Sequence, residues 1–169
     1  MKFRTVIGTL AAAASFLGAA DVVKIERMDL GLAAEIAKRS VEACREQGYW
    51  VSAVVVDRSA NVQVVMRDTY AARFTMTIAQ QKANAVIMAG TDTASFVASR
   101  GDIRNELNNI EGLIMMEGGL PVKSGDTLLG AVGVSGAPGG KLDAACAAKA
   151  LKSLKERLAF ALMDDDEDE

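Results

Sequence analysis

Two glycine-rich apolar segments constrain the fold of this chain most strongly. Residues 117–122 and 130–136 are short, apolar and rich in glycine, and a polar turn at 123–126 separates them. Small and β-branched residues on both sides of such a turn predict a β-hairpin. Glycine weakens the interior of a strand, so its repetition indicates either close packing of a neighbouring backbone or a ligand that approaches the sheet. From the residues alone, both explanations stay open.

The first twenty residues have the pattern of a secretion signal. Lys2 and Arg4 are basic, residues 6–17 are apolar, and residues 18–20 are small, as a cleavage site requires. The apolar run is shorter than a comfortable membrane span, although an uncleaved anchor or an N-terminal helix is the alternative. We therefore assign 1–20 to a signal peptide, which predicts a periplasmic or secreted protein with no membrane span after cleavage.

Six consecutive acidic residues occupy positions 164–169. The chain carries 19 basic and 22 acidic side chains, so this segment accounts for the whole acidic excess. A run of like charges repels itself and stays solvated, which predicts a disordered acidic tail. No basic stripe with interleaved aromatic residues is present in the sequence, which argues against a nucleic-acid partner.

Hydrophobic periodicity predicts one α+β domain over residues 21–163. Helices are expected where apolar residues recur at spacings of three and four, at 30–47, 74–89, 93–99 and 142–163. Strands are expected at the valine-rich runs 51–56 and 62–66, at 113–116, and in the glycine-rich hairpin. This order favours a single antiparallel sheet of about five strands with helices packed on it.

The predicted second helix places Lys82 on its polar side. Its expected core side consists of Phe74, Ile78, Ala85 and Met88. The lysine is then either solvated or part of an anion site.

Cys44 and Cys146 fall on the apolar faces of two predicted helices. An exported protein permits a disulfide, but two buried free thiols are the favoured interpretation.

The chain contains no histidine. This removes the commonest general base, the commonest metal ligand and the commonest axial ligand of haem. Ser–His–Asp and Cys–His sites are excluded, and no cysteine or carboxylate cluster of the zinc type occurs in the sequence. Ser135 lies between small residues, but it has no base to activate it, so a local hydrogen bond is its expected role.

Charged and aromatic side chains follow the second predicted strand. Arg67, Asp68, Tyr70 and Arg73 lie within seven positions of one another. Arginine binds carboxylates through two parallel hydrogen bonds, so these residues predict a basic rim for an anionic ligand. An exposed salt bridge beside a turn is the alternative.

An ordered set of motifs resembles the GlcG/HbpS family of haem-binding or haem-degrading-type domains. The motifs lie at 54–57, 66–68, 82–83, 118–121 and 130–136, followed by Asp143 and Cys146. The similarity extends over about residues 25–160. It implies a profilin-like α/β (α+β) domain that often assembles into homo-oligomers, with haem as a cofactor in some members.

The resemblance and the charged residues together predict a ligand-binding set. Its members are Arg67, Asp68, Tyr70, Arg73, Lys82, Thr91, Gly118, Gly119, Ser135 and Gly136. Where a relative holds haem through a histidine, this chain has no histidine to take that role. The replacement donors are Tyr70, Met28, Met115, Met116, Cys44 and Cys146, unless haem binds by stacking and propionate contacts alone.

The function favoured by the sequence is an exported, non-catalytic protein that binds haem or another small anionic or aromatic ligand. One alternative is an enzyme acting on haem or a small organic substrate, with Arg67, Asp68, Lys82 or Glu117 in proton transfer. The other is an oligomeric sensory module whose surfaces bind protein partners.

Overall fold

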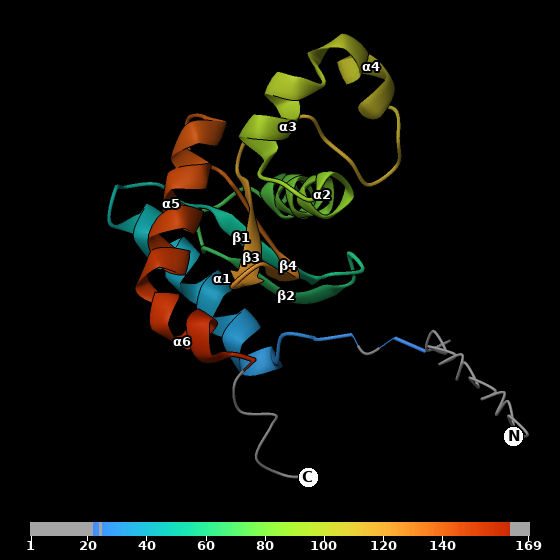
Figure 1. Cartoon of the computed structure of the whole chain (residues 1–169). Helices are drawn as coiled ribbons and strands as arrows, with labels where there is room; N and C mark the ends of the chain where they lie inside the picture. Colours follow the sequence, from blue (N-terminus) through green and yellow to red (C-terminus); the bar gives the residue numbers. More distant parts are fainter. Residues whose placement is uncertain (1–21, 24, 163–169) are drawn as a thin grey trace, which may run out of the picture.

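Four antiparallel strands form one sheet in the order β2-β1-β4-β3 (Figure 1). The strands are β1 (Ser52–Asp57), β2 (Val62–Arg67), β3 (Gly119–Ser124) and β4 (Thr127–Ser135). The computed structural model describes residues 22–23 and 25–162. The predicted signal peptide and acidic tail therefore lie outside the described residues.

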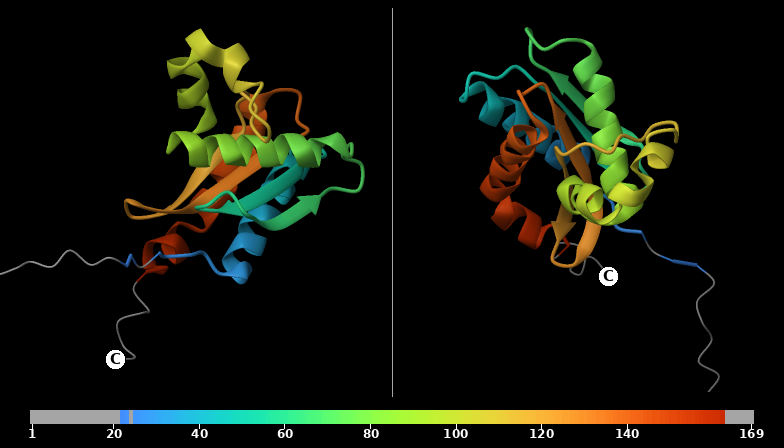
Figure 2. Two further views of the ribbon diagram at one scale, coloured as in Figure 1. Left: turned by 90° about the vertical axis from the view of Figure 1, so that its right-hand side faces the viewer. Right: turned by 90° about the horizontal axis from the view of Figure 1, so that it is seen from above.

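Helices cover both faces of this sheet. They are α1 (Leu30–Arg45), α2 (Phe74–Ala89), α3 (Thr93–Ser99), η1 (Gly101–Ile103), α4 (Arg104–Leu107), α5 (Gly140–Ser153) and α6 (Lys155–Phe160). Helices α1 and α5 lie on one face and α2 on the other, while α3 and α4 project beyond α2 (Figures 1 and 2). None of the helices among the described residues is long and apolar enough to cross a membrane.

Strand β1 is buried along its whole length because both of its faces are covered. Ala53 and Val55 belong to the core cluster under α1 and α5. Val54 and Val56 pack with residues of α2 on the other face. The continuous apolar run at 51–56 predicts this central position, and the structure confirms it.

Helix α2 lies unusually close to the sheet. Gly119 and Gly133 are paired across β3 and β4, and a Cβ atom added at Gly133 would lie 1.9 Å from the carbonyl oxygen of Ala79. A Cβ atom at Gly119 would lie 2.6 Å from the carbonyl oxygen of Lys82. Close packing of a helix backbone therefore explains these two glycines of the hairpin.

Because of this close approach, the buried side of α2 differs from the predicted one. Its contact surface is made of small residues, chiefly Ala79 and Ala83, together with Lys82. The predicted core positions Phe74 and Met88 are exposed. The prediction was wrong at these two positions because it followed large apolar side chains, whereas small residues face the glycine pair, and Ala85 is buried as predicted.

The strand predicted at 113–116 is absent, so the sheet has four strands where about five were expected. Side chains form hydrogen bonds with the backbone of this segment instead. Asn108 accepts from the amide of Met115, and Arg104 donates to the carbonyl of Met115. With both groups satisfied in this way, the segment forms no ladder with β3.

The long helix predicted at 142–163 is divided at Leu154 into α5 and α6. The Ser153 hydroxyl donates to the carbonyl of Ala150, and Arg39 of α1 donates to the Ser153 carbonyl, with a donor–acceptor distance of 3.3 Å. Such bonds compete with the helical ladder. Leu154 and Leu158 nevertheless stay in the core.

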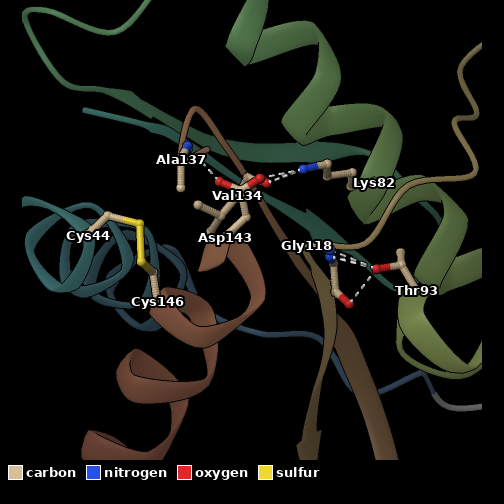
Figure 3. A network of polar contacts seen from close by, with 9 residues as sticks. Cys44, Lys82, Thr93, Gly118, Val134, Ala137, Asp143 and Cys146 are labelled. Carbon is tan, nitrogen blue, oxygen red and sulfur yellow. Dashed lines mark hydrogen bonds and ion pairs between the residues drawn. A yellow bond between two sulfur atoms is a disulfide. The ribbon is translucent and has the colours of Figure 1, made fainter. Parts of the chain in front are cut away.

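Cys44 and Cys146 form a disulfide between α1 and α5 (Figure 3). The expectation of two free thiols was therefore wrong. Helical periodicity places each cysteine on an apolar face, but it does not show that the two faces meet. The bridge closes a loop with a sequence separation of 102 residues.

Removing this bridge is expected to weaken the fold strongly. A cross-link over about 100 residues restricts the unfolded chain, so Cys44→Ala/Cys146→Ala should lower the free energy of unfolding by about 2–5 kcal/mol. Urea unfolding followed by circular dichroism measures the change. The wild-type protein unfolded in the presence of dithiothreitol is the matched control, and equal stability with and without the bridge would contradict the expectation.

Candidate functional site

A buried ion pair joins the two layers of the molecule at the end of the sheet. Lys82 of α2 is 1 % exposed, and its Nζ donates to Asp143 Oδ2 at 2.7 Å and to the carbonyl of Val134 at 2.9 Å (Figure 3). Asp143, in the first turn of α5, also accepts from the amide of Ala137 at 3.0 Å. Each charged group is therefore hydrogen-bonded as well as paired.

The electrostatics of the pair are dominated by burial. Loss of water around the carboxyl raises the pKa of Asp143, and the Lys82 ammonium and the Ala137 amide oppose that effect. A buried pair of this kind contributes little net stability, but breaking it leaves an uncompensated charge in the interior. The pair therefore fixes the position of α5 relative to α2.

Thr93, the first residue of α3, holds the start of β3. Its Oγ1 accepts from the amides of Gly118 and Gly119, both at 3.0 Å, and donates to the carbonyl of Gly119 (Figure 3). Gly118 has a φ of 126°, and a Cβ atom there would lie 2.7 Å from Lys82 Nζ. Lys82, Gly118 and Gly119 of the predicted set thus meet in one buried network.

The sequence-based prediction chose Thr91 and missed Thr93. Thr91 lies just before α3 and contacts only the carboxylate of Asp92, at 3.5 Å. Asp92 caps α3, so an N-cap pattern at 91–92 marks where the helix starts. It gives no signal for which of the two threonines faces β3.

A cleft with a volume of about 410 Å³ opens beside this network. One wall comes from α3, α4 and the segment before β3, and the other from the start of α5. Its lining residues are Val97, Arg104, Met115, Met116, Glu117, Gly139, Gly140, Lys141 and Leu142. The segment 115–117 runs directly into Gly118, and Leu142 precedes Asp143, so the network holds both walls. We call this the α5 cleft.

The α5 cleft combines apolar surface with charge on both walls. Val97 and Leu142 contribute apolar side chains, while Arg104 and Lys141 contribute cations from opposite walls. The N-terminus of α5 has no side-chain cap, and the positive end of a helix favours anions. Glu117 is the one carboxylate among the lining residues. The cleft therefore suits a partly apolar ligand that carries negative groups.

A second cavity of about 430 Å³ lies between the start of α1 and α6. Its arginines already face acidic groups, since Arg157 lies 3.8 Å from Asp29 and Arg27 lies 4.0 Å from Asp57. It has no contact with the buried network. We therefore place the candidate site at the α5 cleft.

The predicted arginine rim does not reach the α5 cleft. Asp68 is buried and accepts from Arg45 of α1 at 2.9 Å, while Arg67 donates to backbone carbonyls of its own loop. Arg73 stacks over the ring of Phe74. These contacts are local to the connection between β2 and α2.

The remaining predicted residues lie at the same end of the sheet as this rim. Tyr70 packs edge-on against Trp50, with ring centroids 5.4 Å apart. A Cβ atom at Gly136, which has a φ of 135°, would lie 2.5 Å from the carbonyl oxygen of Trp50. Ser135 is buried at the end of β4, paired with Ser52.

Of the ten predicted residues, three belong to the buried network, namely Lys82, Gly118 and Gly119. Six lie around the start of β1 and the ends of β2 and β4, namely Arg67, Asp68, Tyr70, Arg73, Ser135 and Gly136, and we call this region, with Trp50, Tyr70 and Phe74, the aromatic end of the sheet. Thr91 belongs to neither group, and none of the ten lines the α5 cleft.

The structure separates the candidate donors for haem iron. Cys44 and Cys146 are bonded to each other, and Met28 and Met115 are buried. Tyr70 is 77 % exposed but lies outside the α5 cleft, whereas Met116 lines the cleft and is 41 % exposed. No group of three or more acidic or cysteine side chains suited to a metal ion occurs within the described residues.

Comparison with known proteins identifies the family. The family described as "Haem degrading protein HbpS-like" matches residues 28–152. The chain belongs to this family. Among curated proteins, none matches it.

Solved structures of HbpS-like proteins share the fold. A double glutamate-to-aspartate variant of HbpS from Streptomyces reticuli is 30 % identical, with a TM-score of 0.74 over 85 % of this chain and 98 % of that one. ORFY from Klebsiella pneumoniae is 25 % identical, with a TM-score of 0.73 over 80 % and 95 %. PduOC, solved as a heme complex, is 20 % identical, with a TM-score of 0.66 over 76 % and 95 %, and shows the same fold.

Breaking the ion pair is expected to destabilise this HbpS-like domain in a pH-dependent way. Lys82→Met leaves the Asp143 carboxylate buried without a cation, at a cost of about 3–5 kcal/mol at pH 7. Burial raises the pKa of Asp143, and loss of the ammonium raises it further. A raised carboxyl pKa stabilises the folded state below the unfolded pKa of about 3.9, and that contribution is lost as the pH rises.

The cost of Lys82→Met should therefore shrink as the pH falls from 7 to 4. The matched control is Lys82→Met/Asp143→Asn, which keeps an acceptor for the Ala137 amide but has no carboxyl to titrate. Urea unfolding of both variants across this pH range measures the gap between them. A gap that stays constant with pH would contradict the assignment.

Proposed function

We propose that this protein binds haem, or a related anionic and partly apolar small molecule, in the α5 cleft and does so without catalysing a reaction. The observation that carries the proposal is the composition of the cleft. Arg104 and Lys141 come from opposite walls, Val97 and Leu142 add apolar side chains, and the exposed Met116 adds a thioether. The propionates, the ring and the iron of haem need these three kinds of group.

The residues present fit haem even without histidine. Arg104 and Lys141 would hold the propionates, and Val97 and Leu142 would pack against the ring. Haem supplies a redox-active iron, and methionine sulfur is an established ligand for it. The family name, which refers to haem degradation, and the heme complex of PduOC support the same ligand class.

The chemistry around Lys82 favours binding over catalysis. Its ammonium donates to Asp143 and Val134 beneath the cleft surface, so it does not face a ligand. Glu117 and Arg104 line the cleft, but Arg104 donates to the carbonyl of Met115. Proton transfer would then rest on Glu117 alone.

A haemin titration tests the binding site. We expect a saturable Soret change at one haem per chain, and a loss of about tenfold in affinity for Lys141→Gln because a charged hydrogen bond is worth roughly 1.5–3 kcal/mol. Arg73→Gln is the matched control, since Arg73 is an arginine of the predicted rim outside the cleft. The opposite ranking of the two variants would move the site to the rim.

Export is also part of the proposal. The disulfide between Cys44 and Cys146 supports it, because disulfides persist in oxidising compartments. The secretion-signal pattern of residues 1–20 points the same way.

We expect the protein recovered from the periplasm or medium to begin at Asp21 and to contain no reactive thiol. Mass spectrometry with thiol alkylation measures both properties. Leu10→Arg, which places a charge in the apolar segment, should block processing. A processed chain in the cytoplasm, or an unprocessed chain outside it, would contradict export by this route.

A second candidate function is supported by exposed aromatic side chains. Trp50, Tyr70 and Phe74 are all exposed at the aromatic end of the sheet. Such residues are enriched at protein interfaces, which favours a homo-oligomeric or partner-binding module. A featureless haemin titration on a protein that light scattering shows to be an intact oligomer would favour this candidate.

A further inference from the structure

We infer that Met116 is the iron ligand in the α5 cleft, and that the site therefore binds ferrous haem more tightly than ferric haem. This inference rests on the proposed function. It adds the donor atom and the preferred oxidation state, neither of which follows from binding alone.

The first step is the choice of donor. The lining residues of the cleft include two methionines, one carboxylate, one lysine and one arginine. Met115 is 1 % exposed, whereas Met116 is 41 % exposed and is therefore the more accessible of the two methionines. Arginine and lysine are protonated at neutral pH and have no free lone pair. Met116 and Glu117 remain as neighbouring donors.

The second step is the difference between these two donors. Thioether sulfur is a soft, neutral ligand and suits electron-rich metal ions, while carboxylate oxygen is hard and suits ferric iron. Met116 is exposed, and Glu117 is only partly exposed. The backbone of Gly140 also packs against Glu117, since a Cβ atom at Gly140 would lie 2.8 Å from the Glu117 Cβ. The softness of the donor and its greater exposure therefore favour Met116.

The third step links affinity to reduction. Ferric haem accepts one electron from an external reductant, dithionite in the experiment below, and becomes ferrous haem with no change in the protein's covalent bonds. If the ferrous form binds about tenfold more tightly, the midpoint potential of bound haem rises by about 59 mV relative to free haem. Methionine ligation raises haem potentials in the same direction.

The test compares three porphyrins on the full exported chain. Haemin, haemin reduced anaerobically with dithionite, and metal-free protoporphyrin are titrated into the wild-type protein, Met116→Leu and Met88→Leu. Met88 is exposed and outside the cleft, so it is the matched control for the substitution. Absorbance spectra report the spin state of the iron, and the titrations give the three dissociation constants.

We expect wild type and Met88→Leu to bind ferrous haem about tenfold more tightly than ferric haem, with a ferrous spectrum that Met116→Leu does not reproduce. Met116→Leu should lose this preference and keep its affinity for metal-free protoporphyrin, because the ring contacts remain. Equal binding of both oxidation states, or a preference that survives in Met116→Leu, would overturn the inference while leaving the proposed function intact. If no porphyrin binds, the inference fails together with the proposed function.

Discussion

Burial of the Lys82 ammonium is the constraint on which the rest of the structure depends. The backbone of α2 lies against a paired Gly119 and Gly133, and a helix this close to a sheet leaves no room for large side chains between them. Lys82 is on the buried side of that contact, so its charge requires a partner inside the protein. The partner is Asp143, which comes from the helix on the opposite face of the sheet. One ion pair therefore connects both layers.

The two walls of the α5 cleft follow from this connection. Asp143 fixes the first turn of α5, and thereby Gly140–Leu142, through Lys82 and the Ala137 amide. Thr93 fixes the start of β3 through three hydrogen bonds, and thereby the preceding residues 115–117. Apart from the buried Met115, the cleft residues are exposed or partly exposed. Their arrangement is set by groups buried beneath them, which leaves the lining free to contact a ligand.

The sequence predicted features that depend on neighbours along the chain, and it missed those that depend on how distant elements meet. Asp29 and Asp92 cap α1 and α3, and Gly90 ends α2 in the left-handed region, which are the residue types that local helix-end signals call for. The central strand and the glycine-rich hairpin were also correct. Lys82 was expected on a polar face, because the sequence of a helix does not reveal that glycines oppose it. The Cys44–Cys146 pairing and the role of Thr93 were missed for the same reason, since each depends on how elements distant in sequence meet.

Because the chain has no histidine, the contacts of its other donor side chains decide which of them could ligate haem iron. The disulfide that ties α1 to α5 engages both cysteine sulfurs, so neither is available as a thiolate ligand for haem. Met28 and Met115 are buried in the core, and Tyr70 packs against Trp50 after β2, the edge strand opposite β3. Met116 is then the soft donor that the cleft exposes among the described residues. A neutral thioether beside two cations stabilises the less positive oxidation state of iron, because the surrounding charge already disfavours ferric iron. The cations on the cleft walls and the thioether donor thus both favour ferrous iron.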